Sequence, residues 1–154
     1  MKLIQRMQAF ILATLLVSGA LFFAGCGKET VTPKSEHEQL FDYLTGTGNK
    51  QWFLKAVYIN GVIQPLTDAQ KKYYKTYTRT QTPFFATFLD DDGNRGDAFL
   101  LSVIQLKESI NNGPLGALTR DYVIRELKEK SMDLEITAPA GQPAQIVREV
   151  YYAN

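Results

Sequence analysis

The chain has 154 residues and a formal net charge of +1, from 17 Lys and Arg against 16 Asp and Glu. Residues 1–25 hold two of the bases and no acid, which leaves 15 bases against 16 acids in the rest. This balance excludes the concentrated positive field that phosphate backbones attract, so we expect no nucleic-acid partner. The remaining residues, about 129 in number, suffice for one domain, and their Tyr and Phe content favours β structure.

The N-terminal stretch is apolar. Lys2 and Arg6 precede an apolar run over residues 9–23 that only Thr14, Ser18 and Gly19 interrupt. The run is shorter than the roughly 20 apolar residues of a membrane-spanning helix. A basic start followed by a short apolar run predicts a secretory signal peptide over residues 1–25. An uncleaved anchor helix, or an ordinary signal peptide that ends near a cysteine by chance, is the alternative.

The apolar run ends in Phe23-Ala24-Gly25-Cys26, and Cys26 is the only cysteine. This sequence resembles the lipobox of bacterial lipoprotein signal peptides, with Phe23 where Leu is commonest. The resemblance implies cleavage before Cys26, a diacylglycerol on its sulfur and an acylated new N-terminus. Several acyl chains hold a protein firmly on a membrane, since each buried CH₂ contributes about 0.8 kcal/mol.

The segment after the lipobox is polar. Residues 26–34 predict a flexible tether between the membrane and the domain that follows. Gly27 stands where Asp commonly marks retention in the inner membrane, so the resemblance implies the outer membrane. The face of that membrane, periplasmic or external, stays open.

A short helix is predicted next, over residues 36–44. Ser35 and Glu38 have the spacing of a capping box, in which each side chain satisfies a free backbone N–H of the first turn. Gly46 is suited to end the helix. Its apolar residues at helical spacing, which we expect to cover one end of the domain, are Leu40, Phe41 and Leu44.

Alternation of apolar and polar residues predicts a series of strands at the spacing of an antiparallel meander. Asn60-Gly61 is a two-residue hairpin signal, and residues 107–119 are predicted to be a loop. The expected strands are residues 52–59, 62–64, 73–80, 84–89, 98–106, 122–127, 132–137 and 144–152.

The order of lipobox, tether, short helix and strands resembles the lipocalin-like lipoproteins of Gram-negative bacteria. The matching positions are Leu44, Thr45, Gly46, Lys50, Trp52 and Leu54, with weaker similarity over residues 122–127, 134–136 and 150–152. The resemblance implies an all-β fold, a small up-and-down antiparallel barrel of about eight strands within residues 35–154. Two features depart from the family: Lys50 replaces a Gly two residues before the Trp, and a single cysteine excludes the usual disulfide.

Barrel-interior positions are the candidate binding residues. In lipocalins an Arg of the last strand packs on the first-strand Trp, so Arg148 is expected either to stack on Trp52 or to face solvent. An eight-stranded barrel is either filled by side chains or holds one small ligand; we expect a mostly filled interior with a shallow mouth. The residues assigned to the interior or to a ligand are Trp52, Tyr58, Tyr77, Phe99, Tyr122 and Arg148.

No catalytic, cofactor or metal site is expected, and the chain is not predicted to be an enzyme. His37 is the only histidine and lies in an exposed first turn, so it is expected on the surface. Residues 90–94 (DDDGN) do not place oxygen ligands at the alternate positions of an EF-hand loop, and no closing Glu follows. We therefore expect an acidic hairpin turn here, with a weak Ca²⁺ site as the alternative.

Two functions remain open. The first is a lipid-anchored envelope protein that binds a small apolar or amphipathic ligand. The second is an accessory subunit of an outer-membrane protein complex that uses a filled barrel as an interaction surface, with an exposed apolar patch.

Overall fold

A capped helix begins the part of the chain that the computed structural model describes, which comprises residues 32–111, 117–137 and 145–154. Helix α2 (Glu36–Thr45) has the predicted capping box, since Ser35 Oγ accepts from the Glu38 N–H and the Glu38 carboxylate accepts from the Ser35 N–H. Gly46 ends the helix with φ of +60°, which favours glycine. The predicted helix is confirmed, whereas the predicted signal peptide and Cys26 lie outside the described residues.

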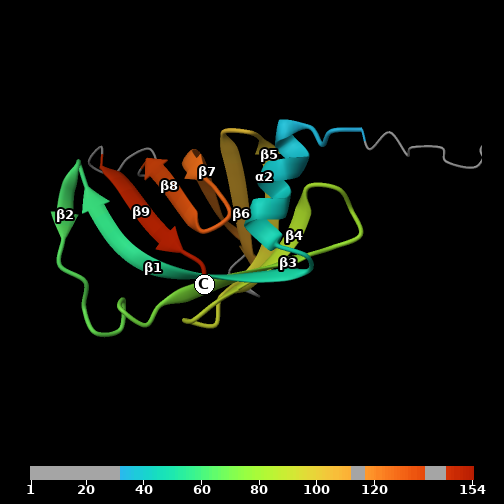
Figure 1. Cartoon of the computed structure of the whole chain (residues 1–154). Helices are drawn as coiled ribbons and strands as arrows, with labels where there is room; N and C mark the ends of the chain where they lie inside the picture. Colours follow the sequence, from blue (N-terminus) through green and yellow to red (C-terminus); the bar gives the residue numbers. More distant parts are fainter. Residues whose placement is uncertain (1–31, 112–116, 138–144) are drawn as a thin grey trace, which may run out of the picture. The chain divides into compact units, whose positions relative to one another are not determined.

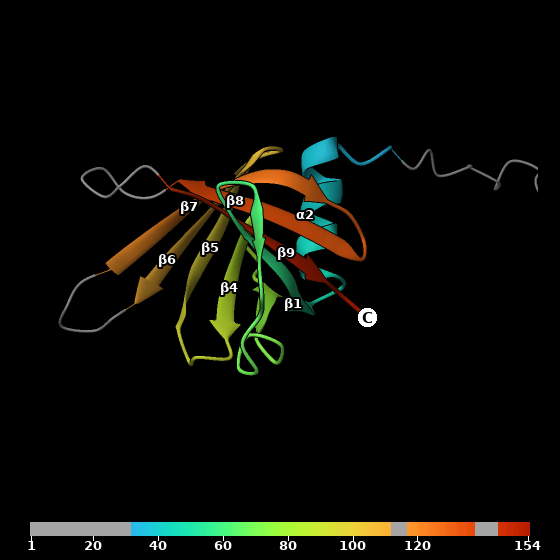
Figure 2. The same ribbon diagram turned by 90° about the vertical axis from the view of Figure 1, so that its left-hand side faces the viewer.

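The strands form a single antiparallel sheet that closes into an eight-stranded barrel. The sheet order is β2-β1-β3-β4-β5-β6-β7-β8-β9, and pairing of β1 with β9 completes the ring (Figures 1 and 2). Strand β2 pairs with β1 alone and is the extra, ninth strand. The bounds are β1 Asn49–Ile59, β2 Val62–Gln64, β3 Tyr74–Arg79, β4 Phe85–Asp90, β5 Arg95–Ser102, β6 Gln105–Asn111, β7 Ala117–Leu127, β8 Ser131–Thr137 and β9 Ile146–Tyr152.

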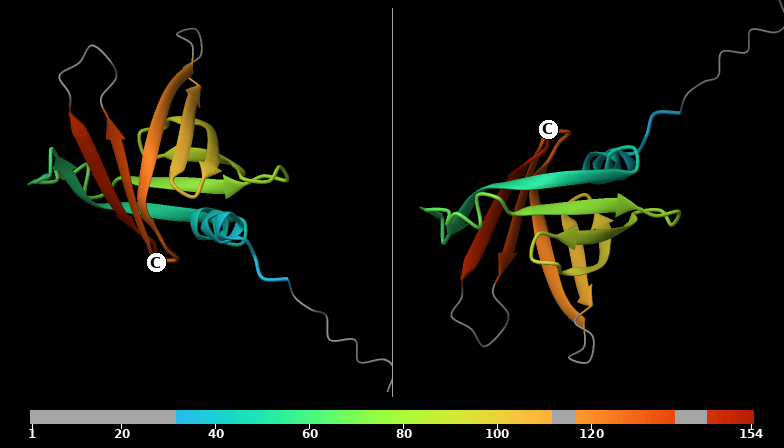
Figure 3. Two further views of the ribbon diagram at one scale, coloured as in Figure 1. Left: turned by 90° about the horizontal axis from the view of Figure 1, so that it is seen from above. Right: turned by 90° about the horizontal axis from the view of Figure 1, so that it is seen from below.

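The two ends of the barrel differ. Helix α2 contacts β1, β3 and β7, and its residues meet the start of β1 and the end of β3 (Figure 1). Because neighbouring strands are antiparallel, the end of β1 and the start of β3 lie at the opposite end, where no described helix covers the barrel (Figure 3). We call these the closed end and the mouth. Among the described residues, none belongs to a helix with the length and apolar character that a membrane crossing demands.

The predicted strand over residues 98–106 is wrong in being continuous, and the predicted loop over residues 107–119 is wrong at residues 107–111 and 117–119, which lie in strands. Residues 112–116 lie outside the described residues. A turn at Val103-Ile104 separates β5 from β6, and β6 continues to Asn111. The sequence pattern does not reveal β6 because of Glu108, which is fully buried between Leu106 and Ile110 on the inward face of this strand. A carboxylate at an inward position interrupts the apolar alternation by which a strand is recognised.

A β-bulge in β1 changes which side chains face the interior. Leu54 pairs with Tyr151 and Ala56 with Val150, so Lys55 is an extra residue on β1. Leu54 is buried before the bulge, and Val57 faces inward after it, opposite Glu149. The bulge lies between the part of β1 that pairs with β3 and the part that pairs with β2.

Gly96 allows β5 and β6 to approach closely. A Cβ atom at this position would lie 1.9 Å from the backbone oxygen of Ser109, far inside contact distance. Glycine is therefore required for the pairing of Gly96 with Ile110.

Candidate functional site at the mouth of the barrel

The closed end of the interior is apolar and is organised by Trp52, which is fully buried. Its Nε1 donates a hydrogen bond of 2.9 Å to the Leu44 carbonyl at the end of α2. Lys50 Nζ lies 4.6 Å from the centre of the indole ring and donates to the carbonyls of Tyr43 and Glu129. The helix is thereby fastened across this end of the barrel.

A buried ion pair occupies the middle of the interior. Lys75 Nζ of β3 lies 3.1 and 3.2 Å from the two carboxylate oxygens of Glu108, and both side chains have at most 1% of their surface exposed. Lys75 also donates to the Tyr122 hydroxyl at 3.0 Å, and Tyr77 donates to Glu108 at 2.5 Å. These contacts satisfy the charges that burial would otherwise make costly.

Folding raises the pKa of Lys75 and of the phenols around it. Desolvation is the largest single influence and would lower the pKa of Lys75, but Glu108 and the phenols of Tyr151, Tyr77 and Tyr122 together outweigh it, and the pKa stands well above its ordinary value. Burial, followed by the charge of Glu108, raises the pKa of Tyr77, and burial raises the pKa of Tyr122 and Tyr151. All these groups therefore keep their protons well into the alkaline range.

Two further charges extend the pair toward the mouth. Arg120 NH1 of β7 lies 3.9 Å from Glu108 Oε2, and Glu149 Oε2 of β9 lies 3.9 Å from Lys75 Nζ. Tyr151 donates a hydrogen bond of 2.7 Å to Glu149. The result is an interior charge row of alternating sign, in the order Arg120, Glu108, Lys75 and Glu149.

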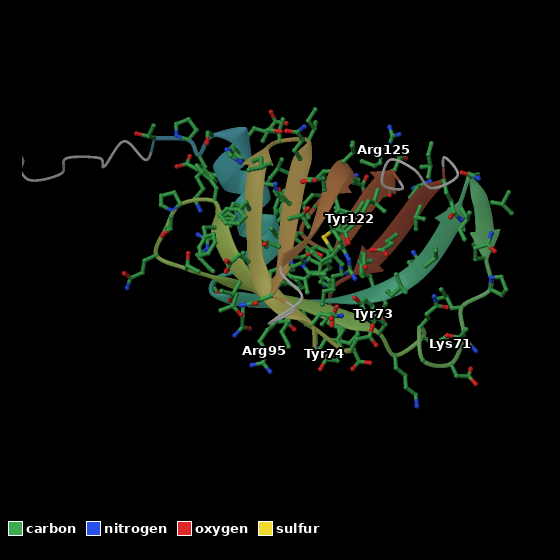
Figure 4. All side chains as sticks on the ribbon, turned by 180° about the vertical axis from the view of Figure 1, so that it is seen from behind. Lys71, Tyr73, Tyr74, Arg95, Tyr122 and Arg125 are labelled. Carbon is green, nitrogen blue, oxygen red and sulfur yellow. The ribbon has the colours of Figure 1, made fainter. Side chains whose placement is uncertain are left out.

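The outer members of the charge row line a cavity of about 310 Å³ at the mouth. Arg120 and Glu149 keep 30% and 26% of their side-chain surface exposed, in contrast to the buried pair. Tyr122 lies in the middle of the barrel in Figure 4, whereas Tyr74 and Lys71 lie at its periphery. The full lining of the mouth cavity is Leu54, Val57, Gln70, Tyr73, Asp92, Arg120, Val147, Glu149 and Tyr151.

In the acidic turn beside the mouth, the Asp90 carboxylate is occupied by hydrogen bonds from nearby residues. Asp90 accepts hydrogen bonds from the backbone N–H and the side-chain amide of Asn94 and from the Tyr73 hydroxyl. Gly93 has φ of +80°, as such a turn requires. Within the described ranges, no three His, Cys, Asp or Glu side chains are grouped so as to hold a metal ion.

Three of the six residues predicted for the interior lie there. Trp52 and Tyr77 have no exposed surface, and Tyr122 has 3%. The other three face outward: Phe99 packs on Phe85 with ring centroids 4.8 Å apart, and Arg148 packs on Tyr58 with its guanidinium carbon 4.9 Å from the ring.

The alternative in which Arg148 stacks on Trp52 is wrong. Arg148 binds the carboxylate of Asp133 on the outer face of β8, and Lys50 supplies the cation over the indole ring. Tyr58 lies outside because the bulge at Lys55 reverses the alternation of β1 beyond Leu54. Register, which fixes these faces, is not visible in the residue pattern of one strand.

His37 is less exposed than predicted. Its ring stacks on Phe84 at a centroid distance of 3.8 Å, and Nε2 lies 2.9 Å from the Leu100 carbonyl oxygen. Phe84 has φ of +59°, so the backbone before β4 is held in an unfavourable conformation beneath this stack. The contact fixes α2 to the end of β5.

The residues that sequence reasoning missed are the charged members of the row. Lys75 and Glu149 occupy inward positions of predicted strands beside more conspicuous aromatic residues, and Glu108 lies in a segment predicted to be a loop. A signal was present: Lys75, Glu108 and Arg120 all fall at alternate positions with buried aromatic or aliphatic residues. Charges on an otherwise apolar stripe indicate a buried ion pair or a site.

A larger hollow of about 730 Å³ lies on the outer side of the barrel. Its lining side chains come mainly from outward positions of β4, β5 and β6, namely Thr87, Leu89, Arg95, Asp97, Ser109 and Asn111. Its charged residues, Arg95 and Asp97, are both exposed on β5, whereas those of the mouth adjoin the buried pair. The mouth is therefore the better candidate for a specific ligand.

Comparison of the chain with protein families, curated proteins and solved structures gives no significant match. The closed antiparallel barrel agrees with the fold that the lipocalin resemblance implies. The geometry of the mouth and of the charge row is therefore the guide to the function of this protein.

Proposed function

We propose that this protein is a lipid-anchored, non-enzymatic protein of the cell envelope that binds a small amphipathic ligand in the mouth of its barrel. The observation that carries the proposal is the mouth cavity, where Leu54, Val57 and Val147 form an apolar wall beside Arg120 and Glu149. Binding sites for small molecules combine mainly apolar walls with a few converging polar groups. A wholly apolar ligand fits this lining less well, because it would desolvate both charges without replacing their partners.

The anchoring part of the proposal depends on Cys26. Expression of the full chain in a Gram-negative bacterium with labelled palmitate should give a labelled protein in the outer-membrane fraction, and Cys26→Ser should lose both the label and the cleavage. Unlabelled wild-type protein, or labelled Cys26→Ser protein, would contradict a lipid on this thiol. Protease treatment of intact cells would then report the membrane face.

Ligand binding is tested with the chain from residue 27, which lacks the anchor and retains the whole barrel. Thermal shift and native mass spectrometry against fatty acids, haem, sterol-like compounds and small zwitterions should give a complex with an amphipathic compound. Arg120→Gln should weaken it, while Arg125→Gln, which alters an ion pair with Glu135 on the outer face, should not. Failure of every compound to bind would remove the proposed function.

The exposed apolar residues favour a second candidate, an accessory subunit of an outer-membrane complex. Leu101 and Ile104 are more than half exposed beside the β5–β6 turn, and Val123 of β7 is 43% exposed nearby. Clusters of exposed apolar side chains mark protein interfaces. Crosslinking in cells should recover one abundant partner that Leu101→Ser and Ile104→Ser lose, and the absence of any such partner would count against this function.

A further inference from the structure

The two members of the charge row that reach the mouth have opposite signs. Lys75 and Glu108 neutralise each other at 3.1 Å, within hydrogen-bond distance, whereas Arg120 and Glu149 each lie 3.9 Å from their partners in the row, beyond it. The inner pair is thereby satisfied. The outer charges, each about one-quarter to one-third exposed, remain directed at the cavity that both residues line.

We propose that the mouth binds a zwitterionic amphiphile, with its anionic group on Arg120, its ammonium group on Glu149 and its apolar part against Leu54, Val57 and Val147. This inference rests on the proposed function and specifies the chemical class of the ligand. A ligand with one charge would satisfy one of the two residues and desolvate the other. A ligand with both charges satisfies each with a charge-assisted hydrogen bond.

The donors and acceptors at the mouth have capacity for both groups. A guanidinium carries five N–H donors, and the contacts described for Arg120 are Glu108 at 3.9 Å and the Tyr122 phenol. Glu149 accepts the Tyr151 hydroxyl at one oxygen, Oε2, and its carboxylate has further lone pairs for an ammonium. The phenol rings of Tyr73 and Tyr151 also line the cavity and offer faces to a cation.

The size of the cavity limits the ligand. A cavity of about 310 Å³ has room for an amino acid or a lipid head group, and a long acyl chain would extend out of it. Both sources present the same chemistry, an anion and an ammonium a few bonds apart. A free amino acid adds its own apolar side chain, whereas a zwitterionic phospholipid leaves its chains outside.

The test uses ligands matched in shape and different in charge. Leucine carries both groups, 4-methylpentanoate lacks the ammonium, and 3-methylbutylamine lacks the carboxylate. Short-chain phosphatidylethanolamine and phosphatidylglycerol form the lipid arm, with and without the ammonium. Isothermal titration with the chain from residue 27 should show that leucine or phosphatidylethanolamine binds at least about tenfold more tightly than its singly charged counterparts, as expected for one charge-assisted hydrogen bond.

Single substitutions test which residue of the mouth binds each charged group of the ligand. Arg120→Gln should weaken the zwitterion and 4-methylpentanoate but not 3-methylbutylamine, and Glu149→Gln should do the reverse. Arg125→Gln on the outer face is the matched control and should change none of them. The comparison among ligands on the wild-type chain stands by itself if a mouth variant fails to fold.

The outcomes separate this inference from the proposed function. Equal affinity for zwitterions and singly charged analogues, or binding of fatty acids or sterols alone, would overturn the zwitterion inference and leave ligand binding in the mouth intact. Loss of the zwitterion in only one of the two mouth variants would overturn it as well. If no compound in either set binds, both fail.

Discussion

The closed end and the mouth of this barrel are stabilised in different ways. At the closed end, α2 lies over Trp52, and its buried residues Phe41 and Leu44 join the apolar core that also includes Met132. Toward the mouth, the inward positions of β3, β6, β7 and β9 carry Lys75, Glu108, Arg120 and Glu149. One half depends on apolar burial and the other on a network of charges and phenols.

The difference supports the mouth as the half in which we propose that a ligand binds. A buried ion pair is often neutral or unfavourable for stability compared with apolar residues of similar size. A barrel needing only a filled interior would extend the apolar core of the closed end to the mouth. The charges at the mouth thus point to a role beyond folding, and the following changes test this contrast.

The largest loss of stability is expected when one member of the buried ion pair is replaced. Glu108→Leu leaves the Lys75 charge in the interior with no carboxylate at hydrogen-bond distance, and should cost about 3–5 kcal/mol of unfolding free energy. The double variant Lys75→Met with Glu108→Leu should recover most of that loss. Urea unfolding of both variants measures it, and a double variant as unstable as the single one would show that the pair itself stabilises the barrel.

At the closed end, the expected response is that of an ordinary core. Leu44 is 1% exposed and packs beside Trp52, so Leu44→Ala should cost about 3 kcal/mol through lost burial and the cavity left behind. The affinity of the mouth for its ligand should be unchanged in the same variant. A change in affinity would mean that the two ends are coupled.

Alkaline pH should destabilise the mouth half selectively. The pKa values of Lys75, Tyr77, Tyr122 and Tyr151 are raised by folding, whereas unfolded Tyr and Lys release their protons at about pH 10 and 10.4. Above about pH 10 the folded state therefore binds more protons than the unfolded state, and stability falls by about 1.4 kcal/mol per pH unit for each such group. Below that pH their contribution is fully present.

Chemical denaturation at a series of pH values measures this slope. The variant Tyr77→Phe removes one of the titrating groups and should make the slope shallower. Absence of the slope in the wild type, or a slope that Tyr77→Phe leaves unchanged, would contradict the assignment of these groups to a buried network.

The smallest effect is expected at the helix cap. Ser35→Ala removes the hydroxyl that accepts from the Glu38 N–H and should cost about 1 kcal/mol. Ser35→Asp, which preserves a capping oxygen, should restore the stability. Thermal unfolding followed by circular dichroism is sensitive enough, and an equal loss in both variants would exclude capping as the cause.

Local chemistry made much of the fold predictable. The capping box set the start of α2, Gly46 set its end, and Asn60-Gly61 set the β1–β2 turn, where both residues have positive φ. The site was not predictable in the same way. Lys75 and Glu108 lie 33 residues apart in sequence, and each looks like a surface residue until the barrel brings them within 3.1 Å.

The outward positions of Tyr58 and Arg148 could not be derived from alternation either. Alternation assigns faces correctly only while a strand keeps its register, and the extra residue in β1 breaks that register at Lys55. Phe99 is predicted inward for a different reason: its inward neighbours Ala98 and Leu100 are less conspicuous than its aromatic ring. The prediction places large aromatic side chains in the interior, although the outer face of this barrel also carries aromatic pairs.

The bulge at Lys55 makes the composition of the mouth independent of the composition of the closed end. If Lys55 took a regular position in β1, Tyr58 would replace Val57 on the inward side while Trp52 and Leu54 stayed in place. Deleting Lys55 would instead remove the bulge and keep Val57 opposite Glu149, so the inward side would be unchanged. A shift of one residue in the register of β1 beyond Leu54 can therefore replace an aliphatic wall of the cavity with an aromatic one, while the core at the closed end stays the same.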